Sequence, residues 1–253
     1  MPFRDFKLHW FALILLATAV CVSGCGSERS SVAAKVGQTA IKKTTVEHWM
    51  DLIDAGATTG PGQQEPKAPR PPSFSACIGY HKRYDTKHGA SAARLKQQCE
   101  YEYEKLKLKA LYKLICAAWA EEDAARLNIT VKPSELALRL ASLKRELGGD
   151  AAFRQLLTSR RASVADILLG DKEALLLEKI QQRLEHSNES RHLSKAQRQA
   201  VLKDYGATQV RLWRARTDCQ RGYVVPLCKQ FHASKVPFGI VPPAIPLTEL
   251  VAG

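Results

Sequence analysis

The chain lacks the motifs that identify most enzyme classes. Its 253 residues contain no GxSxG, HExxH, P-loop or GxGxxG pattern, and these patterns mark serine hydrolases, zinc peptidases and nucleotide-binding enzymes. No CxxC pair is present, which argues against a thioredoxin-like oxidoreductase. None of the seven histidines lies at helical metal-binding spacing from another. We therefore expect no catalytic residue, no cofactor and no metal site.

Two further absences narrow the fold and the partners. No segment of roughly 20–50 residues is repeated, which excludes a solenoid or a propeller. No helix-turn-helix, RNA-binding or zinc-finger signature accompanies the net charge of +13, so nucleic acid is not an expected partner. A basic surface of this kind suits anionic lipid headgroups, anionic wall polymers or acidic unfolded chains.

The apolar run near the start of the chain is short. Residues 10–24, WFALILLATAVCVSG, carry no charge and follow a start that contains Arg4 and Lys7. As a helix this run would extend about 22 Å at ~1.5 Å per residue. A membrane-spanning helix needs roughly 20 residues, or about 30 Å, so the run is too short to span a bilayer. A positive start, a short apolar middle and a small-residue end predict a secretory signal peptide over residues 1–24.

The end of this segment, VSGC at residues 22–25, resembles the bacterial lipobox. In such precursors the cysteine receives diacylglycerol and becomes the first residue after cleavage, so the resemblance implies lipidation of Cys25. The lipobox prefers leucine where this chain has Val22. Residues 25–31 are then a lipidated, solvated tether, and the acyl chains hold the protein on the membrane at ~0.8 kcal/mol per buried CH₂. The alternatives are an ordinary signal peptide with a chance cysteine, or a short uncleaved anchor.

The seven cysteines divide by position. Cys21 leaves with the signal peptide, and Cys25 receives the lipid. Cys116 lies in the apolar helical run LYKLICAAWA, which predicts a buried thiol. Outside the membrane the remaining four can form disulfides in three connectivities: Cys77, Cys99, Cys219 and Cys228.

The nearest-neighbour connectivity, Cys77–Cys99 and Cys219–Cys228, is the one that we favour. It would fasten the proline-rich segment before Cys77 onto a helix and would close DCQRGYVVPLC into a short loop. A metal site is the alternative, with Cys219, Cys228 and His232 as ligands. Their spacing matches no common zinc pattern, so we disfavour it.

Two short strands and a helix are predicted where the domain begins. VAAKVGQTAI, residues 32–41, predicts a strand pair around a turn at Gly37. TTVE then forms a capping box, because Glu47 stands three residues after Thr44. A helix with an apolar face should follow as far as residue 54.

Two segments are rich in proline. Residues 55–76 hold five prolines and three glycines, which no helix or central strand tolerates, so we expect a loop. Residues 231–253 hold four prolines and are expected to form an extended tail.

Helical patterns fill most of the remaining sequence. The longest runs from about Ser91 to Leu127, with Asn128 in the left-handed conformation that ends a helix. The fold class is therefore mostly α, with a very small N-terminal β-hairpin. Further helices are expected to begin at Pro133, after a cap at Asp150, and after a capping box at Ser163. The last helix is expected over residues 194 to about 216, with an interruption near Gly206.

Two segments resemble the SurA and PrsA group of extracytoplasmic foldases. VAAKVGQTAIKKTTVEHWM resembles the opening strand pair of that group and its turn into the first helix, except at Lys42 and Lys43. Residues 114–167 resemble the helices that follow, with Asn128 in place of the usual glycine. The resemblance implies that residues 32–230 form a multi-helix domain like the N-terminal chaperone domain of SurA.

That domain holds unfolded or newly secreted chains in an apolar cradle between helices, without ATP. Many members add a parvulin domain that isomerises X-Pro bonds. The segment between Leu184 and Trp213, where that domain would lie, is too short to contain it, so none of its catalytic residues is assigned. The resemblance thus implies a lipid-anchored chaperone of secreted proteins on the extracytoplasmic face of the bacterial cell membrane.

Two alternatives stay open. One is a peptidyl-prolyl isomerase with an unrecognised site, and the other is an envelope lipoprotein that binds anionic wall polymers through its positive charge. Clustering of nine basic residues on one face would favour polymer binding, whereas scattering would favour the chaperone. They are Lys105, Lys107, Lys109, Lys113, Arg139, Lys144, Arg145, Arg160 and Arg161.

Overall fold

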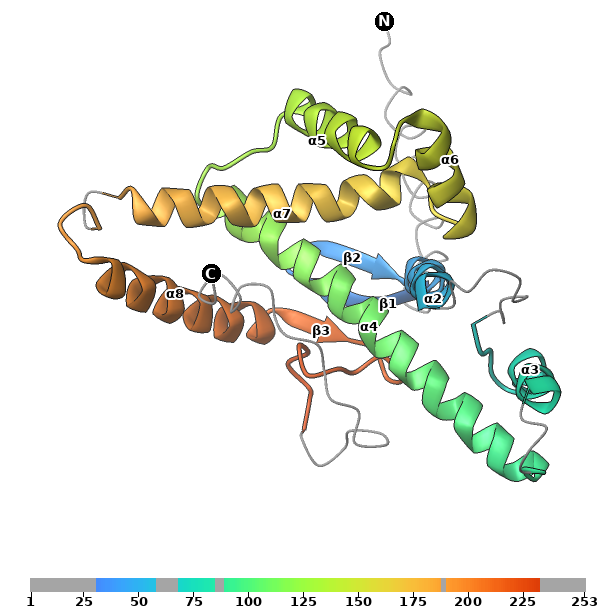
Figure 1. Cartoon of the computed structure of the whole chain (residues 1–253). Helices are drawn as coiled ribbons and strands as arrows, with labels where there is room; N and C mark the ends of the chain where they lie inside the picture. The colour runs from blue at the N-terminus through green and yellow to red at the C-terminus, as the bar shows by residue number, and fades with distance from the viewer. Residues whose placement is uncertain (1–30, 58–67, 85–88, 188–189, 233–253) are drawn as a thin grey trace, which may run out of the picture.

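The computed structural model describes residues 31–57, 68–84, 89–187 and 190–232, and its fold is mostly helical (Figure 1). The predicted signal peptide, Cys25 and nearly all of the tether and of the tail lie outside the described residues. The described part contains seven helices and three strands. The predicted fold class, mostly α with a small strand pair, is therefore confirmed.

The predicted hairpin consists of β1, Val32–Val36, and β2, Thr39–Lys42, which pair antiparallel. Gly37 forms the turn with a φ of +55°, a conformation that glycine adopts without the steric cost of a side chain. A third strand was not predicted. β3, Thr217–Cys219, pairs antiparallel with the other edge of β1, so that the strand order is β2-β1-β3.

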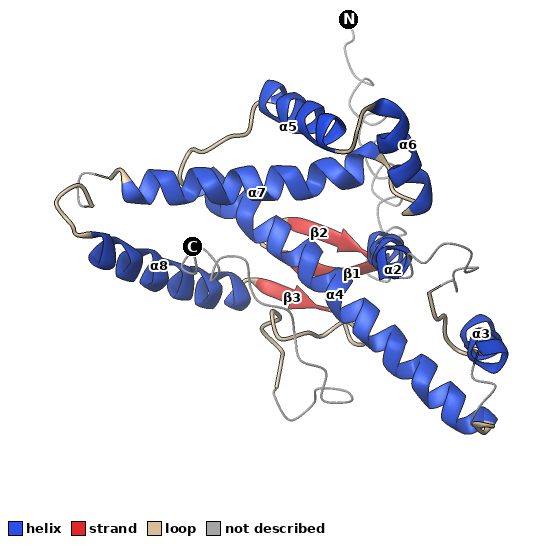
Figure 2. Ribbon diagram, viewed as in Figure 1, coloured by secondary structure: helices blue, strands red, loops and turns tan. Residues whose placement is uncertain are grey.

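Helix α4, Ala92–Arg126, is the central element and crosses one face of the small sheet (Figure 2). It begins and ends as predicted, with the side chain of Ser91 accepting a hydrogen bond from the backbone of Arg94 and with Asn128 at a φ of +55°. Its apolar face forms the core against the sheet and α2, Lys43–Ala57. Trp119 lies in this core with none of its surface exposed.

Helix α7 spans Val164–Glu185, and helix α8 spans Lys195–Ala215. The two helices are consecutive in the sequence and contact each other. Each begins with a serine in a reciprocal capping box. Ser163 was predicted as a cap, whereas residue 194 was expected to be the first residue of its helix. The predicted interruption near Gly206 is wrong, because α8 runs through this buried glycine without a break. A helical glycine costs only about 1 kcal/mol relative to alanine, which a packed helix of this length sustains.

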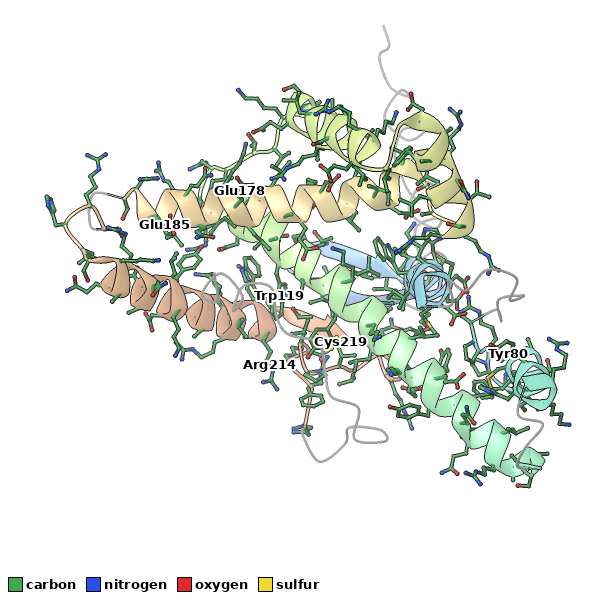
Figure 3. The ribbon with its side chains drawn as sticks, viewed as in Figure 1. Tyr80, Trp119, Glu178, Glu185, Arg214 and Cys219 are labelled. Carbon is green, nitrogen blue, oxygen red and sulfur yellow. A yellow bond between two sulfur atoms is a disulfide. The ribbon has the colours of Figure 1, made fainter. Side chains whose placement is uncertain are left out.

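Helices α5, Pro133–Glu146, and α6, Asp150–Ser159, lie along α7 on the side away from α8 (Figure 1). No residue of α5 is fully buried, and Leu138 is 71% exposed. Glu178 of α7 faces α5 (Figure 3) and accepts a hydrogen bond from Arg139 at 2.6 Å. These two helices therefore form an arm on the surface of the core.

Three local predictions were wrong. Helix α2 begins at Lys43, directly after β2, so that Thr44 is already helical and does not cap the helix. Gly149 occupies the N-cap position of α6, and Asp150 is its first helical residue. Helix α3, Ser75–Tyr84, lies partly in the segment expected to be a loop. It begins three residues after Pro72, where proline no longer interferes, because a proline removes a hydrogen bond to the preceding turn and restricts the residue before it, not the residues that follow.

Candidate functional site

A groove of about 540 Å³ opens where α2, α4 and the start of α7 meet. Its apolar wall consists of Trp49, Leu52 and Ile53 from α2 and Ile167 from α7. All four side chains are half-buried, so part of their apolar surface faces the groove. Pockets of this size with mostly apolar walls are typical of binding sites.

Charged side chains line the remainder of the groove. Lys109, Lys113 and Arg160 supply positive charge. Lys113 forms an ion pair with Glu173, whose side chain is 6% exposed. Lys109 and Arg160 form no ion pair with the residues that the structure describes. These two cations are therefore available to an acidic ligand at the groove.

Asp171 contributes an unfilled hydrogen-bond acceptor. Its Oδ2 atom is buried and accepts no hydrogen bond from the described part of the chain. Leaving a buried acceptor without a partner costs about 1–3 kcal/mol. This oxygen has almost no exposed surface, so a ligand in the groove could reach it only if the surrounding side chains moved.

A contact between α2 and α7 involves Asp166, which lines the groove. His48 Nε2 lies 2.8 Å from Asp166 Oδ1, and Asp166 also accepts hydrogen bonds from the backbone and hydroxyl of Ser163. Burial alone would raise the pKa of Asp166, but the hydrogen bonds from Ser163 and His48 outweigh it and hold that pKa below its usual value. The carboxylate therefore stays ionised and holds the two helices together.

Acid should weaken this contact. Because the folded-state pKa of Asp166 is lowered, its carboxylate contributes stability that is complete above the unfolded pKa of about 3.9. That contribution is lost as the pH falls through the folded pKa. We expect Asp166→Asn to lower the free energy of unfolding by about 0.3–1 kcal/mol at neutral pH, the effect of a charge in a first helical turn. Denaturant unfolding of both proteins at neutral pH and at about pH 3 measures this, and a difference that did not shrink in acid would contradict it.

A second hollow of about 550 Å³ lies between α5 and α7. Leu138 and Leu143 from α5 and Leu175 from α7 line it, together with polar and charged side chains of α5. Asp171 lines this hollow as well as the groove. The arm therefore extends the partly exposed apolar surface beyond the groove.

The nine basic residues considered above lie on three separate parts of the fold. Four are on α4, three are on α5, and Arg160 and Arg161 follow α6. Several are neutralised by neighbours: Lys107 pairs with Glu104 at 2.6 Å, and Lys144 pairs with Asp150 at 2.8 Å. Three of the nine, Lys109, Lys113 and Arg160, meet at the groove, and the other six do not line it.

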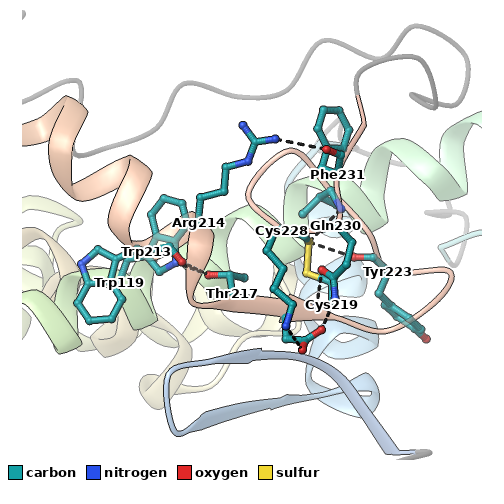
Figure 4. Close-up of a disulfide and its surroundings, with 12 residues drawn as sticks. Trp119, Trp213, Arg214, Thr217, Cys219, Tyr223, Cys228, Gln230 and Phe231 are labelled. Atoms are coloured by element: carbon teal, nitrogen blue, oxygen red, sulfur yellow. Dashed lines mark hydrogen bonds and ion pairs between the residues drawn. A yellow bond between two sulfur atoms is a disulfide. The ribbon is translucent and has the colours of Figure 1, made fainter.

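The structure joins Cys77 to Cys99 and Cys219 to Cys228, with S–S distances of 2.00 and 1.96 Å. This is the nearest-neighbour pairing expected from the sequence. The first disulfide joins α3 to α4, and the second closes the chain after β3 (Figure 4). Cys219 and Cys228 are thus occupied by each other and not by the metal considered with His232. Cys116 is buried and lies outside both disulfides.

One cluster of side chains was not anticipated. The possible ligand atoms of Cys77, His81, Cys99 and Glu102 all lie within 4.8 Å of one another. His81 stands four residues after Cys77, and Glu102 stands three residues after Cys99, so each pair shares one helix face. The i, i+4 spacing of Cys77 and His81 and the i, i+3 spacing of Cys99 and Glu102 are the sequence signal for this cluster.

Comparisons with known proteins give no family for this chain. It matches no protein-family model, no curated protein and no solved structure. Among the residues that the structure describes, no helix combines the length and the apolar character needed to cross a bilayer.

Proposed function

We propose that this protein is a lipid-anchored extracytoplasmic chaperone that binds unfolded secreted polypeptides without ATP. The observation that carries the proposal is the groove between α2, α4 and α7. Its apolar wall is partly exposed, and two of its cations, Lys109 and Arg160, form no ion pair with the residues that the structure describes. The resemblance to the SurA and PrsA group points to the same activity. The distribution of the basic residues over separate elements also favours it over binding of wall polymers.

The chemistry of the groove indicates which clients it would hold. Apolar client side chains would pack on Trp49, Leu52 and Ile53, and acidic residues beside them would pair with Lys109 and Arg160. The net charge of +13 favours acidic clients over basic ones.

The energetics suit a chaperone that releases its clients. Full burial of a leucine or phenylalanine contributes roughly 1.5–3 kcal/mol, whereas association costs on the order of 4–15 kcal/mol. Several client side chains must therefore be bound together before binding is favourable. The affinity of such a half-open groove stays modest, so release needs no nucleotide.

Two assays on the chain from Gly26 onward, which keeps every described residue, test the proposal. One measures suppression of aggregation of a chemically unfolded acidic protein, and the other measures a refolding reaction limited by proline isomerisation. We expect suppression without faster isomerisation. Faster isomerisation would instead support the enzyme, and no effect in either assay would overturn the chaperone proposal.

Membrane attachment through Cys25 has its own test. We expect Cys25→Ser to move the protein from the membrane fraction to the soluble extracytoplasmic fraction, because the serine cannot form the thioether to diacylglycerol. A Cys21→Ser variant is the matched control and should remain in the membrane fraction. Immunoblots of fractionated cells measure both. Retention of the Cys25→Ser protein in the membrane would contradict lipid anchoring.

A further inference from the structure

The cluster of Cys77, His81, Cys99 and Glu102 joins α3 to α4, two helices that are labelled in Figure 1. None of the four residues lines the groove. Phe74, Cys77 and Cys99 form a small core of their own there. Cys77 is 2% exposed and Cys99 is fully buried, whereas the side chains of His81 and Glu102 are 19% and 35% exposed. The two sulfur atoms are therefore inside, and the nitrogen and oxygen donors lie between them and solvent.

The arrangement matches the ligand requirements of a zinc-class ion. Such ions are held tetrahedrally by thiolate sulfur at about 2.3 Å, by imidazole nitrogen at about 2.0–2.1 Å and by carboxylate oxygen at about 2.0–2.2 Å. Those bond lengths place neighbouring ligand atoms about 3.3–3.8 Å apart. Here His81 Nε2 lies 2.9 Å from Glu102 Oε1, and Cys77 Sγ lies 3.4 Å from Glu102 Oε2. The nitrogen and oxygen atoms are already close to these distances, whereas the two sulfur atoms, which are bonded to each other here, must separate to about 3.8 Å once the disulfide is reduced.

A neighbouring amide contacts two members of the cluster. The side-chain nitrogen of Gln98 lies 3.4 Å from Nδ1 and 3.3 Å from Nε2 of His81. It also donates a hydrogen bond to Glu102 Oε1 at 3.2 Å. Gln98 therefore helps to hold the imidazole and the carboxylate next to each other, and neighbouring hydrogen bonds of this kind orient metal ligands in proteins.

We infer that the dithiol form of this cluster is a metal site for a thiophilic divalent ion of the zinc class, bound by Cys77, His81, Cys99 and Glu102. The disulfide and the metal are then two alternative links between α3 and α4. Two sulfur ligands select zinc-class ions over magnesium or calcium, which prefer oxygen donors. The inference does not depend on the chaperone activity.

The site is prepared by reducing the disulfide. A water-soluble phosphine and one water molecule convert the disulfide into two thiols, and the phosphine becomes its oxide. Binding of the divalent ion then releases one proton from each thiol to the solvent. No other redox partner is needed for the experiment.

The test uses Co²⁺ and Zn²⁺ as probes on the full chain, with and without reduction under anaerobic conditions. For the reduced protein we expect one Co²⁺ with the absorption of a tetrahedral, thiolate-bound ion, and displacement of that ion by Zn²⁺. The oxidised protein should show no such absorption. If the reduced protein does not show this Co²⁺ absorption, the inference is overturned.

Variants assign the site within the chain. His81→Ala and Glu102→Gln leave the disulfide intact, so both proteins can be purified folded before they are reduced. Each should weaken Co²⁺ binding at least tenfold, because each removes one ligand. Cys219→Ser, which alters only the other disulfide, should leave Co²⁺ binding unchanged. Equal binding by wild type and a Cys77→Ser variant would place the ion elsewhere and overturn the inference.

Discussion

Replacing Trp119 with alanine is expected to lower the free energy of unfolding by about 3–5 kcal/mol, the cost of removing a large buried aromatic side chain. Trp119 has no exposed surface and lies where α4 meets the sheet and α8. Its Nε1–H donates a hydrogen bond to the hydroxyl of Thr217 at 2.8 Å, and that hydroxyl donates to the backbone of Trp213 at 2.7 Å. The side chain thus connects the central helix with the strand that closes the sheet (Figure 4).

A comparison of two phenylalanine variants isolates that hydrogen bond. Trp213 is also buried, at 1% exposure, but its Nε1–H has no hydrogen-bond partner in the described part of the chain. Trp119→Phe removes a donor that is used, whereas Trp213→Phe removes one that is not. We therefore expect Trp119→Phe to be the more destabilising, by about 1–2 kcal/mol. Denaturant unfolding measures both, and equal losses would mean that the bond to Thr217 contributes nothing.

Replacing Leu52 with aspartate is expected to reduce suppression of client aggregation at least tenfold. Leu52 lines the groove but does not belong to the apolar residues that pack against the main core, unlike its neighbours Trp49 and Ile53. The substitution therefore places a charge on the apolar wall with little cost to folding. Burying that carboxylate against an apolar client is unfavourable, and it also repels acidic clients.

The matched control for this variant is Val201→Asp. Val201 lies on α8, is 40% exposed and is not part of the groove. The same change in charge there should leave suppression within about twofold of wild type, since surface substitutions away from a site are mostly neutral. Light scattering of a diluted, unfolded client measures all three proteins. Equal losses in the two variants would show that charge alone, and not the groove, decides activity.

Local signals predicted most of the helices. Ser163 and Ser194 stand before helical patterns as hydroxyl caps, and the structure begins α7 and α8 at the next residue. Asn128 takes the left-handed conformation expected of it. Such signals need only neighbouring residues, because a cap or a helix end is decided within one turn. They are therefore readable from one sequence.

Elements that depend on distant partners were not predicted. β3 has only three residues, and it forms a strand because it pairs antiparallel with β1, which is far away in the sequence. Gly206 lies inside α8 without breaking it, since tertiary packing can override a weak helix propensity. Helix α3 is short and is held to α4 by the disulfide between Cys77 and Cys99. In each case a contact remote in sequence decides the local structure.

The same distinction applies to the candidate sites. The cysteine pairing could be expected from spacing, because the nearest cysteines form the shortest loops. The groove could not, because its wall and rim come from α2, α4 and α7 and only the folded chain brings them together. The unfilled oxygen of Asp171 is likewise visible only in three dimensions.

The most direct test of client binding in the groove is a photo-crosslink from the groove to a client. A photoreactive phenylalanine derivative would replace Leu52 in one protein and Val201, on the surface of α8, in another. Each protein would be illuminated with an unfolded acidic client, and adducts would be resolved by gel electrophoresis. If clients bind in the groove, we expect client adducts from position 52 and almost none from position 201. Equal adducts from both positions, or adducts from position 201 alone, would contradict a client-binding groove between α2, α4 and α7.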